Sequence, residues 1–110
     1  MDTNKLVHLF HVLIVGGLFL YVGINRDKTY GKLFSALFYL GLIIIVYHLY
    51  KMYGYLNSGK GIWVSLLHVF IIGPLVVYIG YHGEKTARKY FEVLMMLGFA
   101  SIGYHLYYLF

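Results

Sequence analysis

The sequence predicts an all-α membrane protein in which four transmembrane helices form two tandem helical hairpins. Hydrophobic residues make up 61% of the 110 residues and charged residues only 12%, which is about half the charged fraction of a typical soluble domain. Uncharged apolar stretches of about 17–25 residues, the length that crosses a bilayer as a helix, occur at 6–24, 33–50, 62–81 and 93–110. The third observation is that the second half of the chain repeats the first.

The repeat aligns residues 3–53 with residues 60–110 without a gap, and 21 of the 51 aligned pairs are identical. Polar and glycine matches carry the most weight, because apolar identities arise easily in membrane segments. The longest matching run is Tyr47-His48-Leu49-Tyr50 over Tyr104-His105-Leu106-Tyr107. Each half holds two helices and so enters the membrane in the same sense. We therefore interpret the chain as a duplicated hairpin with a pseudo-twofold axis along the membrane normal.

The predicted elements follow from this repeat in chain order. The first hairpin is predicted at 1–53, with helices at about 5–25 and 31–53, and the second at 62–110, with helices at about 62–82 and 87–110. The segment 54–61 is rich in Gly, Asn and Ser, which is typical of a linker. The first helix has a mid-chain counterpart, so we interpret it as a permanent helix and not as a cleaved signal peptide. Thr29 and Thr86 are expected to cap the second helix of each hairpin.

The distribution of cations predicts the orientation of the chain. The two short loops inside the hairpins carry Arg26, Lys28, Lys32, Lys85, Arg88 and Lys89, whereas the other side carries Lys5, Lys51 and Lys60. The positive-inside tendency places the short basic loops in the cytoplasm and both termini on the opposite side. These loops also explain the net charge of +5, so the lipid bilayer is the expected partner and nucleic acid is not. A homodimer or a larger assembly is left open.

Four histidines, one on each predicted helix, fall at about the same depth of the bilayer: His11, His48, His68 and His105. Each lies on the stripe of positions, spaced three and four residues apart, that both repeats keep. Such stripes are expected to form the helix–helix contacts of a membrane bundle. The four imidazoles are therefore predicted to point inward, toward one another or toward a shared cavity. His8 and His82 align with Ser65 and Asn25, so the repeat leaves them outside this set.

Small residues and tyrosines accompany the histidines in both repeats. Gly16 aligns with Gly73, which precedes Pro74, and matched interruptions in two halves of a membrane protein indicate a site near the midplane. Pro74 lacks an N–H group and is expected to kink its helix. Gly41 and Gly98 allow the close approach of either a neighbouring backbone or a flat ligand. Two further candidates adjoin His48 and His105 and would extend a proton relay: Tyr47 and Tyr104.

Three functions follow from inward-facing imidazoles. The first is ligation of haem b or of Cu, Zn or Fe by paired histidines, because no carboxylate lies at this depth to favour Mg, Ca or a di-iron centre. The second is a proton or small-ion channel lined by the same histidines. The third is a structural, non-catalytic membrane protein locked by histidine hydrogen bonds. The chain has no cysteine and no hydrolase motif, so the sequence predicts a redox carrier at most and no enzyme.

The second half-repeat combines Gly73-Pro74-Leu75-Val76-Val77-Tyr78-Ile79-Gly80, a Lys-Thr loop and a Tyr104-His105-Leu106-Tyr107 ending. This combination resembles small uncharacterised membrane proteins of large DNA viruses and marine microbes, and the resemblance covers each half of the chain. It implies a small membrane protein, but it implies no activity and no functional residues.

Overall fold

The computed structural model describes residues 3–59 and 61–110, and these residues are helical apart from short turns, with no β-strand among them. The first long helix runs from Thr3 to Asn25 as α1 (Thr3–Phe10), η1 (His11–Gly16) and α2 (Gly17–Asn25), and it is followed by η2 (Arg26–Lys28) and α3 (Gly31–Ser58). The rest of the chain comprises α4 (Trp63–Leu67), η3 (His68–Ile72), α5 (Gly73–His82), η4 (Gly83–Lys85) and α6 (Arg88–Leu109). The predicted all-α class is confirmed.

Three helical stretches are long and apolar enough to cross a membrane: Lys5–Lys28, Gly31–Ser58 and Trp63–Lys85. The 22-residue helix α6 is not among them, and its first turns carry Arg88, Lys89 and Glu92. Length and composition therefore support a membrane protein with three candidate spans. The fourth span and the sidedness of the loops remain predictions, and Lys60, one of the cations on which the sidedness depends, lies outside the described residues.

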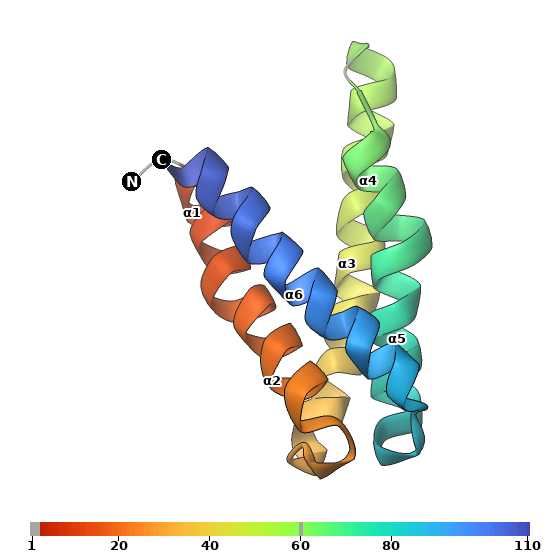
Figure 1. Ribbon diagram of the computed structural model, residues 1–110. Coiled ribbons are helices and arrows are strands. Elements are labelled where there is room, and N and C mark those ends of the chain that lie inside the picture. The colour runs from red at the N-terminus through yellow and green to blue at the C-terminus, as the bar shows by residue number, and fades with distance from the viewer. Residues whose placement is uncertain (1–2, 60) are drawn as a thin grey trace. The chain divides into compact units, whose positions relative to one another are not determined.

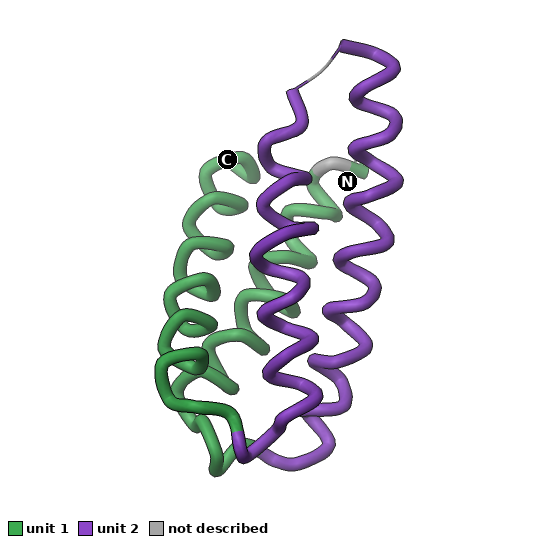
Figure 2. Tube along the Cα trace, turned by 90° about the vertical axis from the view of Figure 1, so that its right-hand side faces the viewer, with its two compact units in different colours: residues 1–29, 86–110 green, residues 30–85 purple. Residues whose placement is uncertain are grey.

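The helices form two compact units, and each unit combines segments from both sequence repeats (Figure 2). Unit 1 comprises Met1–Thr29 and Thr86–Phe110, and unit 2 comprises Tyr30–Lys85. In unit 1, the helix formed by α1, η1 and α2 runs antiparallel along α6, and in unit 2 the helix formed by α4, η3 and α5 runs antiparallel along α3 (Figure 1). The compact units therefore divide the chain differently from the predicted hairpin repeats.

Glycines bring the two helices of each unit into close contact. A Cβ added to Gly23 in α2 would lie 2.7 Å from the Cβ and 2.8 Å from the backbone nitrogen of Met95 in α6. Its aligned residue Gly80 meets the backbone of Phe38 in α3 in the same way. Phe38 and Met95 are themselves aligned in the repeat, so the two helix pairs have the same register. This is the small-residue packing by which membrane helices associate.

The apolar cores of the two units use matching positions. The fully buried side chains of unit 1 are Phe19, Val22, Phe91 and Leu94, and those of unit 2 include Leu37, Val76 and Ile79. Phe34, which aligns with Phe91, is also buried in unit 2. Both the contacts and the cores therefore recur at a separation of 57 residues.

The loops differ from the sequence predictions in two respects. α3 continues past the predicted end at residue 53 to Ser58, and Gly59 terminates it in the left-handed conformation at φ 78°, because a glycine adopts positive φ without steric cost. The N-cap positions of α3 and α6 belong to Tyr30 and Ala87, and neither makes a side-chain cap hydrogen bond. The capping predicted for Thr29 and Thr86 is therefore wrong.

The loops η2 and η4 begin with the same unusual backbone conformation. Arg26 has φ 54° and ψ −126°, and the aligned Gly83 has φ 57° and ψ −131°. This region suits glycine, and a residue with a Cβ is strained there. Arg26 is the only described non-glycine residue with positive φ.

Candidate functional site

Unit 1 brings together two of the four predicted histidines. His11 is the first residue of η1 and His105 lies in the last turns of α6, where it is 9% exposed. Their imidazole rings stack, with centroids 4.2 Å apart and an angle of 27° between the planes. The His11 Nδ1–H donates a hydrogen bond to the Val7 carbonyl oxygen at 2.8 Å. This bond fixes the tautomer and leaves Nε2 of His11 as the nitrogen with the lone pair.

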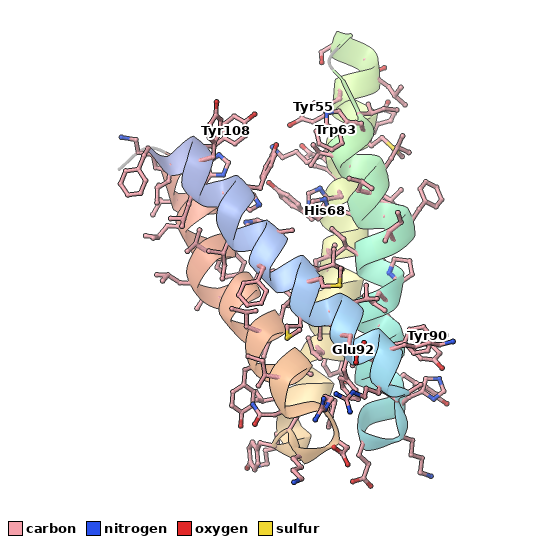
Figure 3. The ribbon with its side chains drawn as sticks, in the orientation of Figure 1. Tyr55, Trp63, His68, Tyr90, Glu92 and Tyr108 are labelled. Atoms are coloured by element: carbon pink, nitrogen blue, oxygen red, sulfur yellow. The ribbon has the colours of Figure 1, made fainter. Side chains whose placement is uncertain are left out.

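Unit 2 brings together the other two histidines in the same way. His48 in α3 and His68, the first residue of η3, stack with centroids 3.9 Å apart and an angle of 20°. The His68 Nδ1–H donates to the Val64 carbonyl oxygen at 2.7 Å, so Nε2 is also the nitrogen of His68 that carries the lone pair. Figure 3 shows His68 on the segment between α4 and α5. The predicted histidines therefore form one stacked pair in each unit.

The π-helical segments explain why His11 and His68 are placed alike. Each of these histidines opens a π-helical segment, and a glycine stands five residues later in both repeats. The Gly73 N–H donates to the His68 carbonyl oxygen, as a π-helix requires, and a Cβ on Gly73 would lie 2.8 Å from that oxygen. The first repeat forms its π-helical segment without a proline. Pro74 is therefore not required for the corresponding segment in the second repeat. Short π-helical segments occur frequently at functional sites.

Pro74 lies in the first turn of α5, directly after η3. Because α4, η3 and α5 form one continuous helix, the missing N–H of Pro74 removes one backbone hydrogen bond from that helix. The interruption that the sequence predicts at Gly16 and at Gly73-Pro74 thus takes the form of a π-helical segment that ends at these residues.

The other site glycines face a neighbouring helix of their own unit. A Cβ on Gly41 would lie 2.6 Å from Val77 Cγ2, and a Cβ on Gly98 would lie 3.1 Å from three atoms of Leu20. Gly16 and Gly73 meet Ile102 and Ile45 in the same manner. Of the two interpretations of these glycines, the close approach of a neighbouring helix is the one that these contacts support.

Tyr47 and Tyr104 lie edge-on to the histidines that follow them. The Tyr47 and His48 ring centroids are 5.1 Å apart, and those of Tyr104 and His105 are 5.0 Å apart, with nearly perpendicular planes in both pairs. Tyr47 also lies 5.7 Å from the Lys51 ammonium. Tyr47 and Tyr104 are each about two-fifths exposed. Each therefore lies at the surface of its unit, in ring contact with one histidine of the stacked pair.

The structure adds His8, which sequence reasoning left out. The Nδ1 atoms of His8 and His105 are 2.7 Å apart, and the His8 ring stacks on Tyr108 at 5.8 Å. Unit 1 therefore holds a cluster of three histidines: His8, His11 and His105. The signal was the spacing of His8 and His11, since residues three apart on a helix share one face.

In both units, the side chains at these positions that could bind a metal ion are imidazoles. The described carboxylates lie elsewhere: Asp27 and Glu84 are in the loops η2 and η4, and Glu92 pairs with Arg88 at 3.0 Å near the start of α6 (Figure 3). His82 lies beside Tyr78 and Tyr81 at the end of α5 and belongs to neither cluster. Nitrogen-only donors favour first-row transition metals over Mg²⁺ and Ca²⁺.

Comparisons with protein-family models, with curated proteins and with solved structures find no match to this chain. The chemistry of the histidine clusters therefore rests on their own geometry.

Proposed function

We propose that the protein binds a divalent first-row transition ion, Cu²⁺ or Zn²⁺, through the stacked histidines of each unit. The observation that carries this proposal is the Nδ1–H bond that His11 and His68 each donate to a backbone carbonyl. In metal sites such a bond orients the imidazole and raises the basicity of the opposite nitrogen. An imidazole inside a membrane segment is costly unless it has a partner or a function, and two units with the same arrangement support a function.

Haem b is supported less well than a single ion. Two axial imidazoles point end-on at an iron from opposite faces of the porphyrin. The rings of His11 and His105, and those of His48 and His68, instead face one another at 4.2 and 3.9 Å between centroids. The residues of each pair, as arranged, do not fit a porphyrin between them.

Proton transfer is the second candidate, because one contact specifically favours it. The 2.7 Å separation of the His8 and His105 Nδ1 atoms is a hydrogen bond between two imidazoles. Imidazole gains and loses protons near neutral pH and passes them between its two nitrogens. This contact belongs to unit 1 alone, whereas the stacked pairs occur in both units.

The test is metal stoichiometry in the detergent-solubilised protein. The protein is stripped with a chelator, dialysed against Zn²⁺ or Cu²⁺, and assayed by elemental analysis beside its His105→Ala, His48→Ala and His82→Ala variants. We expect two ions per chain, the loss of one ion in each of the first two variants, and no loss in His82→Ala, which lies outside both clusters. Circular dichroism and gel filtration establish that each variant is folded.

The other outcomes are equally distinct. One ion per chain, lost in both His105→Ala and His48→Ala, would replace the two paired sites with the shared four-histidine centre that the sequence predicts. A Soret band in the purified protein would favour haem. No bound metal in the folded wild-type protein, together with proton flux in liposomes that His105→Ala abolishes, would replace ligation with conduction.

A further inference from the structure

We propose that unit 1 binds the phosphate group of an anionic phospholipid at its basic end, which comprises Arg26, Lys28, Arg88 and Lys89. The first two cations follow the last turn of α2, and the other two open α6. Because the two helices run antiparallel, all four lie at the end of unit 1 that is remote from its histidines (Figure 1). The lipid site is therefore separate from the proposed metal sites and does not depend on them.

The packing of α2 against α6 brings both arginines of the chain to this end. Gly23 of α2 packs on Met95 of α6, and the same register continued by about one turn places Arg26 level with Glu92. Arg88 lies one turn before Glu92, and its Nε–H donates to the Glu92 carboxylate at 3.0 Å (Figure 3). The sequence contains no other arginine.

The basic end has an excess of positive charge that a lipid headgroup can reach. Three of its cations are exposed and Arg26 is partly exposed. The carboxylates at this end are Asp27 and Glu92, and Glu92 pairs with Arg88. Four cations and two carboxylates leave a net charge of +2, which attracts an anionic headgroup.

Unit 2 lacks both arginines at the aligned positions. Gly83 aligns with Arg26 and Gly31 aligns with Arg88, whereas the two lysines of the basic end have lysine counterparts. A guanidinium group can bind two phosphate oxygens through parallel N–H bonds, and a lysine ammonium acts only as a point charge. The difference between the repeats therefore favours phosphate binding by unit 1.

Arg26 also occupies a backbone conformation that costs stability. Its φ of 54° lies in the region that suits glycine, and the loop of unit 2 has Gly83 there. Strained residues of this kind concentrate at functional sites. Binding of a phosphate group is a function that the Arg26 side chain supplies and that a glycine does not.

The location of the basic end favours a lipid over a free phosphate ion. The apolar stretch that is long enough to cross a membrane is Lys5–Lys28, so Arg26 lies where that stretch reaches the lipid headgroups. The Lys89 ammonium lies 5.2 Å from the centre of the Tyr90 ring, and tyrosines are enriched at this level of a membrane. Ile24 is 57% exposed, so α2 offers apolar surface to an acyl chain beside the cations.

Native mass spectrometry of the full-length protein in detergent tests the site. The delipidated protein is titrated with phosphatidylglycerol, phosphatidylcholine or inorganic phosphate, as wild type, Lys28→Gln, Lys85→Gln and Arg26→Gly. Lys28 and Lys85 are aligned, exposed lysines in the loops of units 1 and 2, so their variants lose the same charge. We expect the wild type to bind one phosphatidylglycerol tightly. Its dissociation constant should rise about fivefold in Lys28→Gln and about tenfold in Arg26→Gly, and stay unchanged in Lys85→Gln.

The Arg26→Gly variant separates lost binding from lost folding, because removal of the strained φ should raise stability. Equal weakening in Lys28→Gln and Lys85→Gln would overturn the site in unit 1 in favour of a general attraction between lipid and cations. Equal affinity for phosphatidylcholine would overturn the selectivity for an anionic lipid. Displacement of the lipid by inorganic phosphate at comparable concentration would overturn the lipid as the source of the phosphate group.

Discussion

Two glycines in one helix allow the close packing of unit 1 to be measured. Gly23 and Gly17 both lie in α2. An added Cβ on Gly23 meets three atoms of Met95 at 2.7–2.8 Å, whereas an added Cβ on Gly17 meets nothing within 4 Å. Alanine at either position gives the same gain in helix propensity, about 0.5–1 kcal/mol. The difference between the two variants therefore isolates the helix–helix contact.

The magnitude follows from the distances. Carbon atoms in favourable contact are about 3.5–4.0 Å apart, so α2 and α6 must separate by about 0.7 Å or more to accept the methyl group of Gly23→Ala. Two of the three opposing Met95 atoms are backbone atoms and cannot rotate away as the end of a flexible side chain would. Such overpacking costs about 1–3 kcal/mol, and we expect Gly23→Ala to be less stable than Gly17→Ala by this amount.

The assay is unfolding in mixed micelles by titration with a denaturing detergent, followed by far-ultraviolet circular dichroism. The free energy of unfolding is compared between the two variants and the wild type under identical conditions. Gly17→Ala should be neutral or slightly more stable than the wild type, and Gly23→Ala less stable. Equal stability of the two alanine variants would refute the register in which α2 packs against α6.

Two further predictions concern the loops and the pairing of the helices. Arg26→Gly should stabilise the protein by about 1 kcal/mol, because it removes the strain of a positive φ. Gly83→Ala should destabilise the protein by a similar amount. The same unfolding titration measures both variants, and a loss of stability in Arg26→Gly would contradict the strain at Arg26. Fragments 1–59 and 60–110, when they are co-expressed, should associate, because α6 is needed to complete unit 1. Co-purification through a tag on one fragment checks this association. Fragments that remain apart would contradict the pairing of helices from the two repeats.

Much of the fold could be predicted from the sequence because it depends on composition and periodicity. Apolar stretches of membrane-spanning length gave the helices nearly to their ends. The end of α3 was less predictable, since Gly54 alone costs a helix only about 1 kcal/mol and the left-handed conformation at Gly59 ends it. The pairing of helices was not predictable, because the repeat-retained stripe of a helix suits either the adjacent helix of its own repeat or the matching helix of the other.

The histidines themselves could be predicted, and their individual partners could not. Comparison of the repeats finds residues that both copies keep, which include His11 and His68. It cannot find a histidine that only one copy has, and this is why His8 was left out. The π-helical segments that place His11 and His68 had a sequence signal in the glycine five residues after each histidine, but a histidine and a glycine at that spacing also occur in ordinary α-helices.

The pairing of helices from different repeats fits the duplication that the sequence predicts. A hairpin that dimerised by packing its first helix on the second helix of its partner would make two identical helix pairs. Fusion of two such hairpins would yield the pairs of units 1 and 2, each with one segment from either repeat and with the same glycine contacts. After fusion, each helix pair can change without its counterpart. His8 opposite Ser65, and Arg26 opposite Gly83, are differences of this kind. The first adds an imidazole in hydrogen-bond contact with His105 to unit 1, and the second places a residue with a Cβ at positive φ in the first loop.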